Sequence, residues 1–500
     1  MLSKLWFRAL LIICLGLIEY SFMLGAPFRV LDDENSILNN PAIHDTAHIK
    51  DIFAQGVFKD QTYYRPLVNL SFMGEYHFFG LKPFYYYLDN LFLHILNAFL
   101  VWGLVSLILE NVTLGFFASL LFLIHPINAE AVNNISGRAI LLGAFFSLIS
   151  LSSFLLYEKL LKKRFLLLCV MSFGLALLCK ESSSVLPGVI LLYLWFRQKS
   201  ATKMWSLAVM VGLYVLLRMS LGITHLFLWE NTSQQVLGFI TFLCSLITGF
   251  RELLLPVGLY FDRSQRLFLS FNDFQAVMTV IFWLVFLLGL WINRRRISKI
   301  TWFLLGWFAL EMLPVSQIIH VIGVSPGMIS AADHFLYLAC IPIFIILIQE
   351  IKTMVQMNVE KKWIKAEIIN FVVGAFLVFL FLTNIEQNIY ASNERAMLQR
   401  SAEYQPLNGR VQSSLGLVYA RKEQFVQAQE HFTMAVLASP HNPRYRISLA
   451  KSICDQGLYQ ECLKIYNEID KPGEFAKLLE ENKKAAQDLM DQQHAQVLPK

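Results

Sequence analysis

Charged side chains are scarce in this 500-residue sequence. Asp, Glu, Lys and Arg make up 16% of the residues, whereas soluble domains carry about 25%. Hydrophobic residues make up 56%, and the mean hydropathy is +0.52. Because the chain is this apolar over most of its length, it needs lipid as its solvent. The net charge of +6 sits in short basic runs between apolar segments, which is typical of cytoplasmic loops and argues against nucleic-acid binding.

Several catalytic and metal-binding signatures are missing. The seven cysteines show no CxxC or other metal spacing, and most lie inside apolar runs, where we expect them to be packing residues. Cys454 and Cys462 are close in sequence and could pair with each other. The sequence has no Gly-rich nucleotide loop and no Ser-His-Asp arrangement, which argues against a nucleotide-sugar enzyme of the cytosolic type.

Long apolar segments recur along the chain, and crossing a bilayer takes about 20 such residues. The candidates lie at about 5–24, 85–109, 112–124, 139–157, 165–179, 184–196, 203–219, 235–255, 273–292, 300–319, 335–350 and 365–384. The first has basic residues before it and no convincing cleavage site after it, so we expect a retained signal anchor. The basic runs at 159–164, 197–203, 294–299 and 361–365 should be cytoplasmic.

A count of crossings sets the predicted topology. The basic runs at 197–203 and 294–299 need an even number of crossings between them, but three apolar segments lie there. We expect 235–255 to be re-entrant or cavity-lining, because Arg251 and Glu252 lie near its end and Pro256 follows it. The predicted fold class is therefore all-α, a polytopic membrane helix bundle (1–384) of about eleven crossings. A first external loop (25–84) and a soluble tail (385–500) would lie outside.

The tail carries a helical-repeat pattern. Seven positions match the tetratricopeptide spacing, in which small residues allow close helix approach and aromatics fill the gap: Leu415, Gly416, Tyr419, Ala428, Phe432, Ala435 and Pro440. A second, degenerate repeat keeps Leu449, Ala450 and Tyr466, so the repeats cover about 409–476. Such a domain can bind a protein partner, but two repeats could also simply pack on the membrane domain.

Three adjacent carboxylates, Asp32, Asp33 and Glu34, follow the first apolar segment. Their mutual repulsion predicts a neighbouring cation or a shared proton. At a membrane surface, such a carboxylate could remove the proton of an acceptor hydroxyl. If the protein binds a divalent metal, Mg²⁺ or Mn²⁺, these three residues would hold it. The alternative is a polar stop after a membrane helix.

Other polar residues fall on the same predicted outer side. Tyr63, Tyr64 and Arg65 suit contacts with sugar or phosphate, or equally an aromatic belt. The remaining candidates are His125, Glu130, Arg138, Lys180, Glu181 and Arg251. The cations among them could stabilise a phosphate leaving group, or the cations and carboxylates could form a structural ion-pair network.

Polar residues also occur inside the apolar segment 85–109, namely Asp89, Asn90, His94 and Asn97. Asn90, His94 and Asn97 share one helical face by their spacing. Polar groups at this depth should face the bundle interior. Hydrogen bonding between helices explains them at least as well as catalysis does.

The sequence resembles a known family at several blocks taken together. They are DDENSILNNPAI (32–43), YYRPLVNLSF (63–72), HPINAEAVNNISGRAILL (125–142), CKESS (179–183), LPVSQII (313–319), ADHFLYL (332–338) and the repeat tail. In this order they resemble the transmembrane and tetratricopeptide-repeat O-mannosyltransferases and their bacterial relatives, within the GT-C glycosyltransferase superfamily. The sequence departs from the family pattern at Ala139-Ile140, at the DHFLYL segment and in its short repeat array.

The resemblance implies a GT-C-like membrane enzyme that transfers a sugar, usually mannose, from a polyprenyl-phosphate donor to a Ser or Thr of a protein. It implies that Asp32 or Asp33 is catalytic. Our own hypothesis from the residues is that Arg138 and Lys180, together with Arg251, hold the donor phosphate. Two other functions stay open from the residues, a non-enzymatic membrane scaffold that recruits partners through the repeats and a lipid or sugar transporter. We expect a bacterial inner membrane with a periplasmic tail, or the ER membrane with a luminal tail in a eukaryote.

Overall fold

The computed structural model describes residues 2–30, 32–54, 63–202, 204–223, 228–319, 321–325, 327–361 and 366–497. Lys203 and residues 362–365 of the predicted basic runs lie outside these ranges. The chain divides into two compact units. The first comprises Met1–Leu259, Phe268–Val321 and Asp333–Ser392, and the second comprises Tyr260–Leu267, Ile322–Ala332 and Asn393–Lys500.

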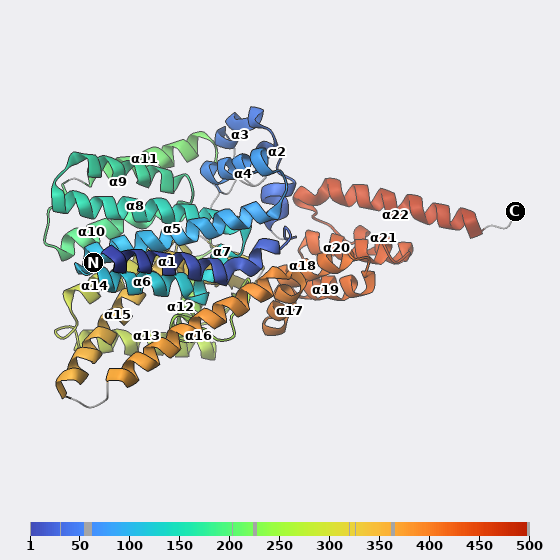
Figure 1. Ribbon diagram of the computed structural model, residues 1–500. Coiled ribbons are helices and arrows are strands. Elements are labelled where there is room, and N and C mark those ends of the chain that lie inside the picture. Colours follow the sequence, from blue (N-terminus) through green and yellow to red (C-terminus); the bar gives the residue numbers. More distant parts are fainter. Residues whose placement is uncertain are drawn as a thin grey trace. The chain divides into compact units, whose positions relative to one another are not determined.

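The first unit is a helix bundle (Figure 1). Its α-helices are α1 (Leu2–Tyr20), α2 (Pro41–His44), α3 (Ile49–Ala54), α4 (Pro66–Phe79), α5 (Pro83–Leu109), α6 (Val112–Ile124), α7 (Ala129–Val132), α8 (Arg138–Leu160), α9 (Lys163–Leu177), α10 (Leu186–Phe196), α11 (Trp205–Ser220), α12 (Thr232–Leu254), α13 (Phe274–Ile292), α14 (Lys299–Met312), α15 (Leu336–Lys361) and α16 (Ala366–Ser392). Short helical turns join them: η1 (Ser21–Gly25), η2 (Glu34–Leu38), η3 (Thr46–His48), η4 (Pro126–Asn128), η5 (Ile135–Gly137), η6 (Glu181–Val185), η7 (Leu313–Val315) and η8 (Asp333–Phe335).

The sequence-based prediction of an all-α membrane protein is confirmed. Each of the twelve predicted apolar segments contains a helix, and several begin at a side-chain cap. Asn111 caps α6, Asn231 caps α12 and Asp273 caps α13, in each case by accepting a hydrogen bond from a backbone N–H of the first turn. The long helices α5, α8 and α9 pack side by side in the bundle (Figure 1).

The number of helices long enough to cross a membrane is smaller than the eleven crossings expected. Seven described helices qualify by length and composition, or eight if the bent pair Val112–Ile124 and Pro126–Val132 is one span. The difference arises because polar residues and prolines end several apolar helices early; for example, α14 stops at Met312, just before Pro314. The segment predicted to be re-entrant forms α12, an unbroken helix of 23 residues that is one of the seven. Its length therefore gives no reason to exclude it from the crossings.

The polar side chains of α5 bond to neighbouring helices. His94 Nδ1 lies 2.8 Å from the Tyr337 hydroxyl, and Asn97 Nδ2 donates to the same hydroxyl at 3.2 Å. Asn90 Nδ2 donates to the carbonyl oxygens of Val132 and Asn134. All three side chains are completely buried. These contacts support the structural interpretation, since a buried polar group in a membrane helix needs a partner.

The second unit combines helices with a small sheet. Its elements are β1 (Ser264–Arg266), β2 (Gly323–Ser325), β3 (Met328–Ser330), α17 (Glu394–Tyr404), α18 (Gly409–Ala420), α19 (Phe425–Ala438), α20 (Pro443–Cys454), α21 (Tyr459–Asn467), η9 (Gly473–Phe475) and α22 (Ala476–Val497). The strands form an antiparallel sheet in the order β1-β3-β2. Strands of three residues give no periodic signal, so the sequence did not predict them.

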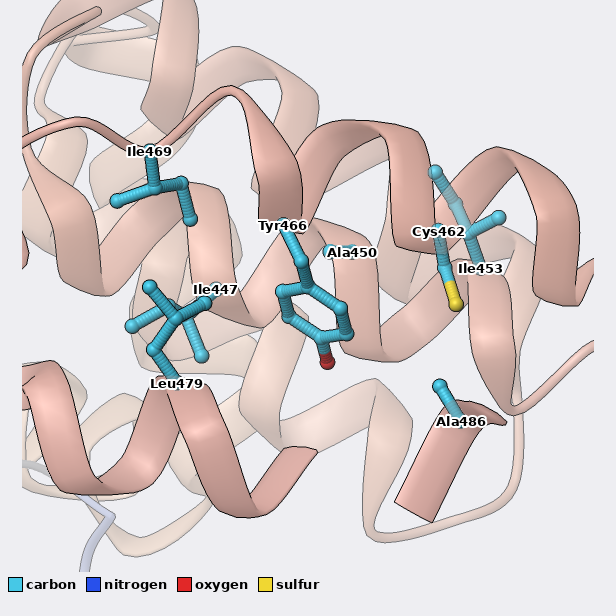
Figure 2. Close-up of a cluster of buried hydrophobic side chains, with 8 residues drawn as sticks. All are labelled: Ile447, Ala450, Ile453, Cys462, Tyr466, Ile469, Leu479 and Ala486. Atoms are coloured by element: carbon cyan, nitrogen blue, oxygen red, sulfur yellow. The ribbon is translucent and has the colours of Figure 1, made fainter. Parts of the chain in front are cut away.

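Helix pairs occupy the positions predicted for the repeats. In the first pair, α18 and α19, Gly416 faces Phe432 so closely that a Cβ on the glycine would lie 2.6 Å from the ring. In the second pair, Ile447 and Ala450 of α20 pack with Tyr466 of α21 and Leu479 of α22 (Figure 2). Cys454 and Cys462 form a disulfide between α20 and α21, as the sequence allowed.

Segments from before residue 393 pack against the helices of the second unit. Asp262 Oδ1 accepts from Arg410 Nη1 at 3.2 Å, and its carbonyl oxygen accepts from Asn408 Nδ2 at 2.9 Å. Gln405 bonds to both the backbone and the hydroxyl of Ser264. The tail helices therefore fold together with residues 260–267, a part of the chain far away in sequence.

Candidate functional site

The two neighbouring aspartates after α1 have different partners. Asp32 is half-buried, and its Oδ2 accepts from the Ser136 hydroxyl at 3.3 Å. Asp33 is completely buried, and its Oδ2 accepts from the Arg29 backbone N–H at 2.9 Å. Asp33 therefore has the environment of a structural residue, while Asp32 reaches the turn before α8.

The predicted external loop is tied to the turn after α9. Both oxygens of Glu181 accept hydrogen bonds from it, Oε1 from the Tyr64 backbone N–H at 3.0 Å and Oε2 from Arg65 Nε at 3.1 Å. The guanidinium of Arg65 also lies 4.3 Å from the Tyr63 ring centre. Its side chain is 21% exposed. Within the described residues its two Nη groups have no hydrogen-bond partner, so they can meet a ligand.

Lys180 lies in the break between α9 and η6 and is half-buried. Burial and the neighbouring charge of Arg65 lower the pKa of its ammonium group to about 7, although Glu181 and Glu311 act in the opposite direction. Lys180 packs on Gly143 of α8, where an added Cβ would lie 3.1 Å from the lysine Cβ. A lysine so close to losing its charge would gain from an anionic ligand.

Asp32 and Lys180 meet the same helical segment. Ser136, the partner of Asp32, and Gly143, the neighbour of Lys180, both belong to the continuous helical stretch Ile135–Leu160. They are two turns apart and hence on one face, separated by roughly 10 Å along the axis. This spacing matches a site with a carboxylate at one end and cations at the other.

Arg138 is completely buried and fully engaged by the protein. Its guanidinium donates to Asn90 Oδ1 at 2.6 Å, to Glu75 Oε1 at 2.8 Å and to Asp89 Oδ2 at 2.8 Å. The Ser71 hydroxyl and the Tyr86 carbonyl oxygen complete the set. These partners account for Arg138 without a ligand and match the ion-pair alternative, in which its role is structural.

The other predicted residues form separate local contacts. His125 is buried; its Nδ1 accepts from the Ile127 N–H, and its Nε2 lies 3.2 Å from the Leu253 carbonyl oxygen. Arg251 is 60% exposed and pairs with Glu252 at 3.0 Å. Glu130 binds His334, with Oε1 3.0 Å from its Nδ1 and Oε2 accepting from its backbone N–H at 3.3 Å.

In the described residues, no group of three or more His, Cys, Asp or Glu side chains is arranged so that it could hold a metal ion. The cluster Asp32, Asp33 and Glu34 does not form such a group either. A divalent metal therefore stays a sequence-based expectation and takes no part in the mechanism below.

Three residues of this region were not among the site residues predicted from the sequence. Glu311 lies near Lys180 and accepts from Trp307 Nε1 at 3.0 Å; a carboxylate inside an apolar segment was the available signal. His334 was noticed only as part of the ADHFLYL block. Arg29, whose Nη2 donates to the Ala391 carbonyl oxygen at 2.9 Å, precedes the acidic cluster and is the kind of cation that the cluster predicted.

Comparisons with known proteins find relatives among animal protein O-mannosyl-transferases. The Caenorhabditis elegans protein O-mannosyl-transferase F38B6.6 is 25% identical over 350 residues, covering 66% of this chain and 49% of that protein. The human protein O-mannosyl-transferases TMTC3 and TMTC1 are each 32% identical, over 177 and 186 residues; both matches cover 33% of this chain, and 19% and 21% of those proteins. The chain thus spans about half of the first relative and about a fifth of the others. No family model and no solved structure matches the chain. The predicted resemblance to the family is confirmed.

Proposed function

We propose that this chain, a relative of the protein O-mannosyl-transferases, is an integral membrane glycosyltransferase that moves mannose from a polyprenyl-phosphate donor to a hydroxyl group of a protein. The observation that carries the proposal is that Asp32 bonds to Ser136 and Lys180 packs on Gly143. These two contact points lie on one face of the helical stretch Ile135–Leu160, roughly 10 Å apart along its axis. A sugar joined to a phosphate has about the size needed to fill this interval.

In the proposed mechanism, the carboxylate acts on the acceptor and the cationic side chains act on the phosphate. Asp32 takes the proton of the acceptor hydroxyl, whose oxygen forms a bond to the anomeric carbon of the sugar. The bond from that carbon to the phosphate oxygen breaks, and its electron pair stays on the phosphate. Lys180 and the free Nη groups of Arg65 stabilise the added negative charge. Attack from the face opposite the phosphate inverts the anomeric centre.

The cellular placement follows from the same proposal. The disulfide Cys454–Cys462 favours an oxidising compartment for the tail. We therefore place the tail outside the cytoplasm, in the periplasm of a bacterium or in the ER lumen of a eukaryote. The tail helices would then be available to an acceptor protein or to a protein partner.

The test is transfer of labelled mannose from polyprenyl-phosphate mannose by the full chain in membranes at matched protein levels. Asp32→Asn keeps the size of the side chain and removes the base, so the rate should fall about 10²–10⁴-fold. Glu34→Gln, which changes the neighbouring carboxylate, is the matched control and should stay near the normal rate. A normal rate in Asp32→Asn would remove the base from this position, and absence of transfer by the unmodified chain from any polyprenyl-phosphate sugar would end the proposal.

A further inference from the structure

The pair formed by Glu130 and His334 has a geometry that the mechanism above does not use. The Glu130 carboxylate makes two hydrogen bonds to His334, one with the ring Nδ1 at 3.0 Å and one with the backbone N–H at 3.3 Å. The Glu130 side chain is nearly buried, and that of His334 is 28% exposed. The ring is therefore held in one orientation and still reaches the surface of the fold.

The second nitrogen of the His334 ring, Nε2, lies on the edge of the imidazole away from the bond to Glu130. In the part of the chain that the structure describes, Nε2 of His334 has no hydrogen-bond partner, whereas both ring nitrogens of His125 bond within the fold. Glu130 bonds to Nδ1, so Nε2 is the ring nitrogen that can bond to a ligand. The half-buried Phe335 ring lies beside the imidazole, with 4.6 Å between the ring centres. Fixed polar atoms and aromatic rings are among the groups that line small-molecule sites.

Few other charged groups face the imidazole. Glu130 is the only charged residue on α7, η4 has none, and the first titratable residue of α15, Tyr337, bonds to His94. On its own turn, His334 follows the buried Asp333. Within the described elements packed against this turn, α7, η4 and the start of α15, the ring thus meets acidic groups and no Lys or Arg, which suits a hydroxyl-bearing ligand better than a phosphate.

The pair lies close to the proposed catalytic carboxylate. Between α7 and α8 the chain turns so tightly that a Cβ on Gly137 would overlap the Ala131 carbonyl oxygen. Glu130 precedes Ala131, and Ser136 precedes Gly137. Since Ala131 and Gly137 touch, the Cα atoms of Glu130 and Ser136 lie within roughly 12 Å of each other. Glu130 holds His334 and Ser136 holds Asp32. The imidazole and the carboxylate therefore flank one turn.

We propose that His334 recognises the sugar of the donor, with Nε2 forming a hydrogen bond to one sugar hydroxyl and Glu130 positioning the ring. This inference rests on the proposed function and adds a residue that selects the sugar. In the proposed mechanism, Lys180 and Arg65 bind the phosphate and Asp32 binds the acceptor hydroxyl. The sugar between them is neutral and rich in hydroxyl groups. An imidazole held in one orientation can form a directed hydrogen bond with such a group.

The experiment compares the unmodified chain with His334→Ala and His334→Gln, using polyprenyl-phosphate mannose and its monodeoxy analogues, each of which lacks one ring hydroxyl. For the complete sugar, kcat/KM should fall about tenfold to a hundredfold in His334→Ala. For one of the analogues, the unmodified chain and His334→Ala should differ less than about threefold, because the lost hydroxyl and the lost imidazole are partners and their effects are not additive. His334→Gln, whose amide can form a hydrogen bond to a hydroxyl, should recover part of the loss.

The matched control is His48→Ala. His48 also bonds a carboxylate through Nδ1, at 2.8 Å from Asp51, but that pair is about half exposed on η3 and α3. Binding of sugar-free polyprenyl phosphate should be equal in all variants, which shows that each is folded and keeps its phosphate site. Equal losses in His334→Ala with every analogue would overturn the sugar contact. A chain that binds polyprenyl phosphate but transfers no sugar would instead refute the proposed function.

Discussion

The guanidinium of Arg138 donates to the Glu75 carboxylate across 2.8 Å, and the Arg138 side chain is completely buried. Asp89 contacts the same guanidinium at 2.8 Å. Removing one partner from such a cluster leaves uncompensated charge inside the protein.

Arg138→Ala should therefore destabilise the membrane unit by about 3–5 kcal/mol. A lower melting temperature in detergent and a lower yield of folded protein are the measurements. Arg294→Ala, at an exposed side chain that bonds to the Trp291 carbonyl oxygen, is the control and should melt like the unmodified protein. An Arg138→Ala variant of normal stability but weakened donor binding would instead place this arginine among the phosphate ligands.

Lys180 makes the stability of the protein depend on pH. Its pKa is lowered to about 7 from the ordinary 10.5, mainly by burial and then by Arg65, so the unfolded chain binds more protons between these values. The free energy of unfolding should therefore rise as the pH increases from about 7 towards 10. Lys180→Met should weaken this rise and melt higher than the unmodified protein at pH 7, while losing donor affinity. Parallel melting curves of both proteins from pH 7 to 10 would contradict the assignment.

The contact between Gly416 and Phe432 leaves no room for a side chain. Gly416→Ala should destabilise the first helix pair of the tail by about 1–3 kcal/mol, because the added methyl group forces the helices apart. Faster hydrogen exchange in α18 and α19 is the measurement. Combining it with Phe432→Ala should cost less than the sum of the two single changes, since the double variant removes the overlap. Strict additivity would mean that the two residues do not meet.

Gln405 links α17 to Ser264 by bonds to both its backbone and its hydroxyl. Gln405→Ala should release residues 260–267, at a cost of about 1–3 kcal/mol for the polar groups left unpaired. Hydrogen exchange should then rise in β1 and in its neighbour β3. Arg446→Ala breaks only the half-exposed contact with Glu468 and should leave both strands protected. Unchanged protection in Gln405→Ala would show that the sheet does not depend on the tail.

The sequence predicted the helices well because each apolar run is a local signal. It also predicted the helices of the tail, and it allowed, without predicting, the pairing of Cys454 with Cys462. It could not predict the partners of Arg138, because Glu75, Asp89 and Asn90 come from other helices that only packing brings together. The proximity of Glu311 to Lys180 could not be predicted for the same reason. The strand β1 is too short to show a periodic pattern in the sequence. Distances in space between segments far apart in sequence were therefore the missing information.

The bond between Ser264 and Gln405 joins residues 141 positions apart, and this separation has a consequence for biosynthesis. A ribosome finishes residues 260–267 well before it makes the helices that hold them. During synthesis the loop must therefore wait without its partners until the tail has been made and has reached the same side of the membrane. Contacts of such long sequence separation form slowly. Protease resistance of residues 260–267 would consequently appear only in chains that are complete, and it offers a direct measure of finished assembly.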